Sequence, residues 1–244
     1  MTGERTAIVT GAGKRVGRDI AAALLADGWQ VVAHVHHDSD DVPEGARKVL
    51  ADLEKPDCAD AIFDAASALP PVRLLVNNAA RFAWDGFGDF DLGEFSAHMA
   101  VNVRAPVLLI ERFAATHAEN EDSLVVNILD SKLAAPNPDF LSYTLSKHAL
   151  GGLTELAARA LATRGIRVNG IAPGLMLRSA GQSEENFEAM HANNPLRRGV
   201  EPADVIGAIR YFIGARCVTG QVLVIDSGQR FLGLDRDVQF LGEA

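Results

Sequence analysis

The sequence predicts an α/β fold: a seven-stranded parallel sheet, doubly wound, with helices on both faces. Short β-branched runs alternate with longer helical patterns, which is the sequence form of repeated βαβ units. A cluster of glycines directly follows the first apolar run, as in folds that bind nucleotides at the first strand-to-helix turn. The sequence has no internal repeat and no linker rich in Pro, Gly or Ser. Together these observations favour a single domain over residues 1–244.

Each predicted strand is a short apolar run. In chain order, the runs cover 7–9, 31–33, 48–51, 74–76, 124–128, 167–171 and 222–225. The main helical patterns cover 18–27, 92–118 and 142–163. In the first of these, Ile20, Ala23 and Leu24 fall on one helical face, and Gly28 follows as a stop signal. The connection between the second and third strands is short, so its crossover helix can be reduced to a loop.

Three further segments lack the pattern of a strand or a long helix. Residues 82–93 combine aromatic residues with Gly and Asp, which indicates a loop. Residues 174–200 are expected to form a substrate flap or a pair of short helices. The C-terminal tail, 231–244, contains several apolar residues and could cover a neighbour's site or its own.

Composition excludes several classes of protein. The chain has 244 residues, of which 48% are hydrophobic, and its net charge is −9. Folding a chain of this size buries roughly 70% of its surface, so no disulfide or metal is needed for a core. The acidic balance disfavours nucleic-acid and membrane-surface partners. Cys58 and Cys217 lack metal-ligand spacing and indicate a reduced compartment. Without a signal peptide or an apolar run of about 18 residues, a cytoplasmic location is expected.

The first strand-to-helix turn predicts a dinucleotide site. Glycines permit a tight turn and let the backbone approach a pyrophosphate at the N-terminus of the following helix. A plain strand-to-helix turn is the alternative, but the strand–turn–helix context favours the cofactor. The expected contacts here are Gly11, Gly13, Lys14, Arg15, Val16 and Gly17.

The end of the second strand bears on the choice between NAD and NADP. An acidic residue that binds the ribose is expected there. His36 and His37 occupy this position instead, with Asp38 just beyond. Lys14 and Arg15 add two cations to the turn, which favours the 2′-phosphate of NADP(H), whereas Asp38 argues the other way. NADP(H) is the prediction, with both His36 and His37 beside it.

Three histidines, His34, His36 and His37, also raise the possibility of a metal site. A metal needs three or four convergent ligands. A polar strand end beside the adenosine explains the same residues more simply, and no metal is expected.

Tyr143 and Lys147 are four residues apart in a strong helical pattern, so their side chains share one face. An ammonium in that position would stabilise a phenolate and lower the pKa of the tyrosine from about 10. The pair therefore predicts a tyrosine general acid. A surface pair is the alternative, and the place of the pair after the fifth strand favours catalysis.

With these motifs in order, the chain resembles the short-chain dehydrogenase/reductase family over residues 5–230. The matching segments are Thr10 to Gly17, Asp52, Asn77-Asn78-Ala79-Ala80, Asn102, Tyr143 with Lys147, Pro173-Gly174 and Asp226-Ser227-Gly228. The resemblance implies a Rossmann-like fold, with Asp52 at the adenine and Asn78 and Ala79 beside the cofactor. It also implies that Asn102 anchors a proton-relay water near Lys147, which holds the nicotinamide ribose. Further cofactor contacts are expected at Leu53, Ala80, Tyr143, Pro173 and Gly174.

Two departures from the family pattern resemble its pteridine reductase and dihydromonapterin reductase branch. Arg15 replaces the usual third glycine, and Asp130 stands where a catalytic serine is usual, thirteen residues before Tyr143. In that branch the arginine reaches the cofactor phosphate and the pterin, and the aspartate joins the Tyr–Lys pair. Two positions differ from the branch, because His37 replaces its arginine and Ala80 replaces a common polar residue.

The resemblance and the residue chemistry together predict a flat heteroaromatic substrate. Phe82 matches the aromatic that stacks on the pterin ring. The expected substrate contacts are Arg15, Phe82, Asp130, Tyr143 and Leu175. Alternatives remain at each step: Phe82 can be a core aromatic, Asp130 can cap a loop, and Ser131 can take the place of the missing serine.

We therefore predict an enzyme, an NADPH-dependent reductase acting on a ring C=N of a dihydropterin or related bicycle. The predicted catalytic residues are Asn102, Asp130, Tyr143 and Lys147. A carbonyl reductase or alcohol dehydrogenase of the same family is the alternative, and a non-catalytic NADP-binding sensor is a third. Apart from the small-molecule substrate, the expected partner is a second copy, in a dimer or tetramer. Small residues along the helix from Ser142 would let another helix approach closely: Ala149, Gly151, Gly152, Ala157, Ala158 and Ala160.

Overall fold

Seven parallel strands form one sheet in the order β3-β2-β1-β4-β5-β6-β7. The computed structural model describes residues 5–117, 121–179 and 181–241. The strands are β1 (Thr6–Val9), β2 (Gln30–Val35), β3 (Arg47–Leu50), β4 (Val72–Asn77), β5 (Ser123–Ile128), β6 (Ile166–Pro173) and β7 (Val222–Ile225). The chain crosses from β3 past β2 and β1 to β4, so the strand order reverses between β1 and β4. In such sheets the crevice at the carboxyl ends of these two strands is the usual ligand site.

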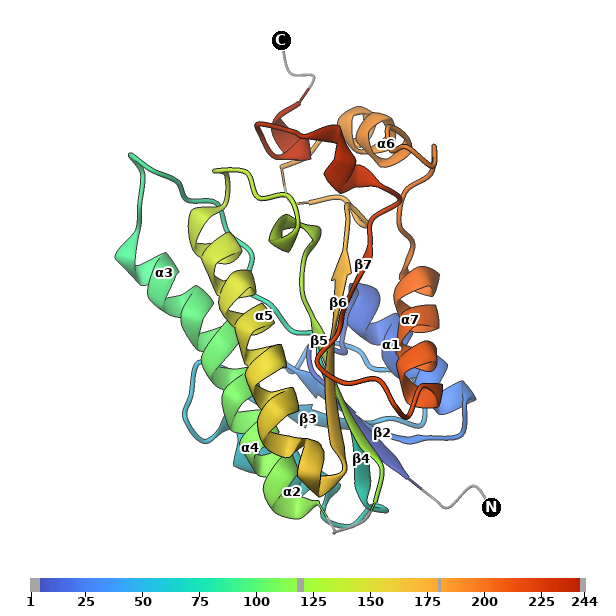
Figure 1. The fold of residues 1–244 in the computed structure, drawn as a ribbon. Coiled ribbons are helices and arrows are strands. Elements are labelled where there is room, and N and C mark those ends of the chain that lie inside the picture. Colours follow the sequence, from blue (N-terminus) through green and yellow to red (C-terminus); the bar gives the residue numbers. More distant parts are fainter. Residues whose placement is uncertain (1–4, 118–120, 180, 242–244) are drawn as a thin grey trace.

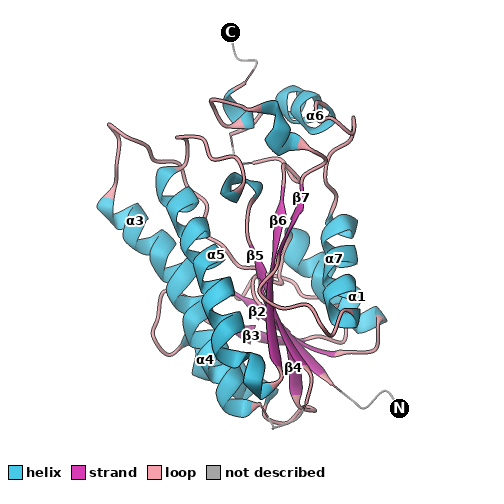
Figure 2. Ribbon diagram, viewed as in Figure 1, coloured by secondary structure: helices cyan, strands magenta, loops and turns pink. Residues whose placement is uncertain are grey.

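Helices cover both faces of the sheet, as predicted (Figures 1 and 2). They are α1 (Arg15–Ala26), α2 (Cys58–Ala66), α3 (Leu92–Met99), α4 (Ala105–Thr116), α5 (Leu141–Leu161), α6 (Glu184–Ala192) and α7 (Pro202–Gly214). Helices α1 and α7 pack on one face, and α2, α4 and α5 pack on the other. The Rossmann-like fold predicted from the sequence is thus confirmed.

Alternation along the strands fills two hydrophobic cores. In β1, Ala7 and Val9 face the α1 and α7 side, whereas Ile8 faces the α2, α4 and α5 side, and all three are fully buried. Because both faces are covered, the inner strands are largely apolar on both sides rather than alternately polar. Among the described residues, no helix is long and apolar enough to cross a membrane.

Element boundaries differ from the prediction in a few places. Helix α1 begins at Arg15, one turn before the predicted start at Arg18, because the glycine turn leads straight into it. The pattern over 92–118 is interrupted by a π-helical turn, Ala100–Arg104, between α3 and α4. The predicted end of that helix at 118 lies outside the described residues. No helix is described between β2 and β3, as the short connection predicts.

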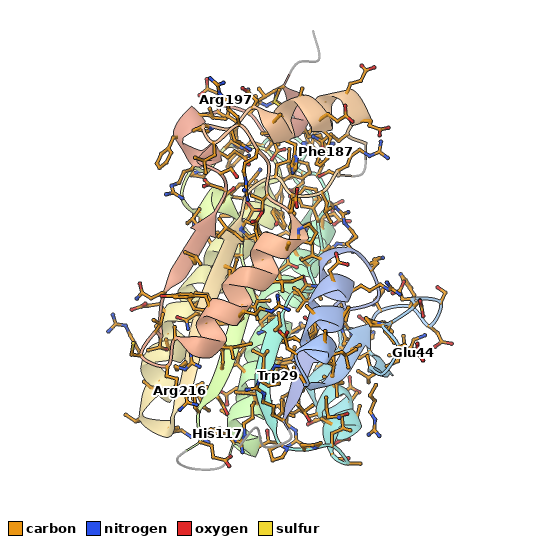
Figure 3. The ribbon with its side chains drawn as sticks, turned by 90° about the vertical axis from the view of Figure 1, so that its right-hand side faces the viewer. Trp29, Glu44, His117, Phe187, Arg197 and Arg216 are labelled. Atoms are coloured by element: carbon orange, nitrogen blue, oxygen red, sulfur yellow. The ribbon has the colours of Figure 1, made fainter. Side chains whose placement is uncertain are left out.

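The segments predicted as flap and tail lie together over the carboxyl ends of the strands (Figures 1 and 3). The flap, 174–200, contains one helix, α6, which carries Phe187 at the upper end of Figure 3. The tail, 231–244, folds back beside α6, and its last three residues, 242–244, lie outside the described residues. The catalytic end of the sheet is therefore covered by chain from the last quarter of the sequence.

Candidate active site

A cavity of about 630 Å³ lies at the carboxyl ends of the strands. Residues that follow all seven strands contribute to its lining. The predicted cofactor residues that line it are Gly11, Gly13, Lys14, Arg15, Val16, Gly17, His36, His37, Asp52, Leu53, Asn78, Ala79, Ala80, Tyr143, Lys147, Pro173 and Gly174. The other predicted site residues that line it are Phe82, Asp130 and Leu175. Of the predicted site residues, only Asn102 lies outside this lining.

The glycine turn is packed tightly against the end of β4. The Thr10 hydroxyl accepts hydrogen bonds from the backbone N–H groups of Asn78 and Ala79, each at 3.0 Å. Gly11 has φ +66°, a conformation that suits glycine. A Cβ placed on Gly17 would overlap the carbonyl oxygen of Gly11. Glycine is therefore required at both positions by this local structure, before any ligand is considered.

The end of β2 is fixed by His34, a residue that the sequence pattern offered as a metal ligand. Its Nδ1 accepts the Gly11 N–H at 3.1 Å, and its Nε2 lies 3.1 Å from the Ala51 carbonyl oxygen, to which it donates in this tautomer. Burial lowers the pKa of His34, which keeps the ring neutral. Among the described residues, no three His, Cys, Asp or Glu side chains are grouped to hold a metal ion. His34 instead links the glycine turn to the end of β3.

The neighbouring acid, Asp38, is paired with Lys48. The Lys48 Nζ lies 3.4 Å from the Asp38 carboxylate, and it also donates to the Asp38 carbonyl oxygen. Asp38 is absent from the cavity lining, whereas His36, His37 and Asp40 belong to it. The acidic residue that argued for NAD thus lies outside the cavity.

Asp130, Tyr143 and Lys147 meet where β5 ends. Asp130 follows β5 and caps a 3₁₀ turn, Ser131–Leu133, by accepting the Lys132 N–H at 2.9 Å. Its other oxygen accepts the Tyr143 hydroxyl at 2.8 Å. The ammonium of Lys147 donates to the Ile128 carbonyl oxygen at 2.7 Å. Asp130 therefore caps the loop and also binds the tyrosine, so the two roles considered for it occur together.

Burial dominates the electrostatics of this cluster. It raises the pKa of the Asp130 carboxyl and lowers the pKa of Lys147 to about 8. The pKa of Tyr143 lies well above 10, because burial and then the nearby Asp130 carboxylate both disfavour a phenolate. The prediction that Lys147 lowers the pKa of Tyr143 is therefore wrong for the protein without ligands. The lysine Nζ is 5.5 Å from the tyrosine ring centroid and bonds to a backbone carbonyl, not to the phenol.

Helix α5 is anchored by a residue that the sequence did not reveal. Phe140, just before the helix, has φ +57°, and the first turn lacks its own side-chain cap. Asp85 supplies one from the 82–93 loop, accepting the Ser142 N–H at 2.8 Å as well as the Ser142 hydroxyl. A carboxylate at this end also suits the helix dipole. Asp85 thereby fixes the loop that carries Phe82 to the helix that carries Tyr143.

Asn102 lies behind the cavity, in the π-helical turn. It is buried and its side chain bonds to the Arg81 N–H at 2.8 Å, to the Arg81 carbonyl at 3.0 Å and to the Ser146 hydroxyl at 2.9 Å. Ser146 directly precedes Lys147. Through these contacts Asn102 connects the loop after β4 to helix α5.

The part of the cavity around Phe82 and Tyr143, where the sequence predicts the substrate, is aromatic. Phe82 is 44% exposed, so it is not a core residue. Its ring stacks on Phe140 at 4.4 Å between centroids and meets Tyr143 edge-on at 4.7 Å. Arg15 reaches the flap, where its guanidinium donates to the Arg178 carbonyl oxygen at 3.1 Å. Phe82 and Arg15, 67 residues apart in the sequence, thus line the same cavity.

Six charged residues of the lining are absent from the predicted site: Asp40, Glu54, Arg81, Lys132, Arg230 and Asp237. The position of Lys132, two residues after Asp130, could have drawn attention to it. Asp237 gave no local signal, because its place depends on how the tail folds back.

Comparisons with known proteins fit this geometry. A family model described as enoyl-(acyl carrier protein) reductase matches residues 11–230. Pteridine reductase 1 of Leishmania tarentolae is 31% identical, with 91% of this chain and 95% of that protein covered. Carbonyl reductase (NADPH) 2 of Sus scrofa is 30% identical, with 91% and 95% covered. A crystal structure of FolM, alternative dihydrofolate reductase 1, from Brucella canis complexed with NADP is 37% identical, covers 95% of this chain and 96% of that chain, and has a TM-score of 0.87.

A doubly wound parallel sheet with a glycine turn and a Tyr–Lys pair at its switch point defines a Rossmann-like oxidoreductase. The matches above extend over almost the whole chain. This protein belongs to the short-chain dehydrogenase/reductase family, which confirms the family predicted from its motifs.

Proposed function

We propose that the protein is an NADPH-dependent reductase of a dihydropterin or a related bicyclic heteroaromatic. The hydrogen bond of 2.8 Å between Asp130 and Tyr143 is the observation that carries the proposal. A carboxyl group joined to the tyrosine suits a substrate with ring nitrogens and an amino group, which offer both donors and acceptors. Similarity to pteridine reductase 1 and to FolM supports the same substrate class.

The residues around the glycine turn fit NADP(H). Gly11 and Gly17 let the turn pack closely against the start of α1, and α1 has neither a side-chain cap nor an acidic residue in its first turn. Lys14 and Arg15 supply positive charge there, and Asp38 is engaged by Lys48. Lys147 would hold the nicotinamide ribose. When bound, NADPH supplies the hydride for a ring carbon of the substrate.

The chain's own residues supply the proton and the orientation. As the ring carbon of the C=N bond accepts the hydride, its nitrogen takes a proton from the Tyr143 hydroxyl or from a water held by Asp130. A buried Asp130 with a raised pKa can keep a proton close to that hydroxyl. The Lys147 ammonium lies one helical turn from Tyr143. Its positive charge favours the phenolate that remains on Tyr143 after the proton has been transferred. Phe82 would stack on the flat substrate and hold it in reach of these groups.

Steady-state assays with NADPH test this proposal. Purified enzyme is given a panel of dihydropterins and, in parallel, 3-oxoacyl and sugar ketones, and consumption of NADPH is followed. We expect kcat/KM to be highest for a dihydropterin. Turnover of the ketones without turnover of any dihydropterin would overturn the proposal.

A carbonyl reductase is the second candidate, and Ser131 is the observation that favours it. Ser131 lines the same cavity directly beside Asp130, so its hydroxyl could serve a ketone in place of the usual serine. Similarity to carbonyl reductase (NADPH) 2 supports this alternative. The ketone arm of the assay is its direct test.

A further inference from the structure

The C-terminal segment, residues 234–241, folds over the substrate half of the cavity. Leu234, Asp237 and Val238 belong to the lining of the same cavity as Tyr143 and Phe82. Val238 is buried, although it lies only a few residues from the chain end. Termini of most domains are poorly fixed unless specific contacts hold them. The contacts of this segment therefore bear on what it does.

An ion pair between Asp237 and Lys132 forms the centre of these contacts. The Lys132 Nζ lies 2.8 Å from the Asp237 carboxylate, and the two side chains are only 9% and 13% exposed. The same ammonium donates to the Asn137 side-chain oxygen and to the Asp139 carbonyl oxygen, each at 3.0 Å. A charge pair removed from water this far needs such additional hydrogen bonds. Loss of either partner would leave a buried charge uncompensated.

Contacts on either side of Asp237 strengthen the attachment. The Asp139 carboxylate accepts two hydrogen bonds from the tail, from the Arg236 Nε and from the Asp237 N–H, each at 2.8 Å. Phe240 stacks on Phe140 with ring centroids 5.9 Å apart and planes inclined by 18°. Phe140 in turn stacks on the proposed substrate aromatic, so the tail extends the aromatic wall of the pocket.

Lys132 joins the tail to the catalytic carboxyl group. While its side chain holds Asp237, its backbone N–H donates to Asp130 at 2.9 Å, and the other oxygen of Asp130 accepts the Tyr143 hydroxyl. A short 3₁₀ turn, Ser131–Leu133, is therefore held from both sides, by the tail and by Asp130. A displaced tail would release one side of this turn.

We propose that residues 234–241 form a wall of their own chain's substrate pocket, and that Asp237 is a positioning residue that holds Lys132, and through it Asp130, for the substrate. The identity of the substrate rests on the proposed function, whereas the attachment of the tail does not. Asp237 acts through Lys132, because its two oxygens are taken by Lys132 and by the Gln239 N–H.

Hydrogen exchange of the C-terminal segment tests the attachment without any substrate. Asp237→Asn keeps the size of the side chain and removes its charge, and Lys132→Met removes the other partner. Asp235→Asn is the matched control, because Asp235 is an exposed acid in the same tail. In full-length protein with NADP, we expect peptides over 231–241 to exchange at least about tenfold faster in Asp237→Asn and Lys132→Met than in wild type or the control.

Kinetics test the role of Asp237 in positioning. With the best substrate of the assay panel, Asp237→Asn should raise the substrate KM about tenfold and change the KM for NADPH by less than about twofold, because the tail is held by Lys132, Asp139 and Phe140, near Asp130 and Tyr143. In a double-mutant cycle, the effects of Lys132→Met and Asp237→Asn on the substrate KM should be less than additive, because both variants remove the same ion pair.

Three results would overturn the inference. Equal exchange of the tail in wild type and Asp237→Asn would show that the pair does not hold it. Protection that disappears when an oligomer is diluted to monomers would assign the tail to a neighbouring copy. An unchanged substrate KM despite faster exchange would remove the positioning role. Failure of every dihydropterin as a substrate contradicts the proposed function instead and leaves the exchange result to decide the attachment.

Discussion

Replacing Asp130 and Ser131 separately distinguishes the two candidate reactions. Asp130 accepts the Tyr143 hydroxyl at 2.8 Å, whereas Ser131 only lines the cavity beside it. For dihydropterin reduction we therefore expect Asp130→Ala to be severely impaired and Ser131→Ala to remain close to wild type.

The size of the effect follows from the buried hydrogen bond. A hydrogen bond to a charged partner contributes about 1.5–3 kcal/mol, and a positioned proton donor accelerates a reaction by about 10²–10⁴-fold. Asp130 supports the donor rather than replacing it, so a loss of about 100-fold in kcat is expected for Asp130→Ala. For Ser131→Ala, we expect a change of less than about threefold.

Steady-state kinetics with NADPH and a dihydropterin measure these values, and thermal unfolding serves as the control for folding. Because Asp130→Ala also removes the acceptor of the Lys132 N–H, we expect it to lower the free energy of unfolding by about 1–2 kcal/mol, which leaves the variant folded for the assay. Near-normal turnover of dihydropterin by Asp130→Ala, together with a large loss in Ser131→Ala, would refute the role given to Asp130.

Four further predictions have defined outcomes. Because burial lowers the pKa of Lys147 to about 8, kcat/KM should fall as pH rises through that value, and a flat pH profile would contradict this. Below about pH 8 the buried Lys147 ammonium lowers the free energy of unfolding, and this effect disappears as the pH rises toward the ordinary lysine pKa. Lys147→Met should therefore abolish turnover and yet raise the free energy of unfolding at pH 7 by about 1–3 kcal/mol, as measured by denaturant titration. Phe82→Ala should raise the dihydropterin KM about tenfold, whereas Phe87→Ala, at a side chain 85% exposed, should leave it unchanged; equal effects would argue against stacking. Gly17→Ala should lower the free energy of unfolding by about 1–3 kcal/mol and weaken NADPH binding, because the new Cβ would overlap the Gly11 carbonyl oxygen. As a control, Gly207→Ala in the middle of α7, where a Cβ meets no neighbour, should raise the free energy of unfolding by about 0.5–1 kcal/mol. Thermal unfolding and NADPH titration measure both effects.

Local sequence patterns were sufficient for most of the sheet and for the centre of the site. Each strand is a short apolar run, and the glycine turn and the Tyr143/Lys147 spacing carry their geometry within a few residues. In a parallel sheet the carboxyl ends of all strands lie at the same edge. Residues that directly follow different strands are therefore expected to line one cavity, however far apart they are in the sequence. That is why residues as distant as Gly11 and Gly174 could be assigned to the same site.

Features that depend on packing were not predictable in this way. The pKa of Tyr143 is raised rather than lowered, because burial outweighs the effect of a lysine whose ammonium is bonded elsewhere. Asp85 caps α5 from a loop more than fifty residues earlier. Part of the small-residue set on α5, including Ala157 and Ala158, is buried in this chain's own core, so that pattern does not by itself indicate a second copy.

Transfer of deuterium from the cofactor to the pterin tests the central claim most directly. NADPH deuterated at the transferable position of nicotinamide C4 is incubated with the enzyme and a dihydropterin, and the product is examined by mass spectrometry and NMR. We predict a tetrahydropterin with one deuterium on the ring carbon of the former C=N bond. A pterin without deuterium, with the label found only in the alcohol product of a ketone added in competition, would contradict the account.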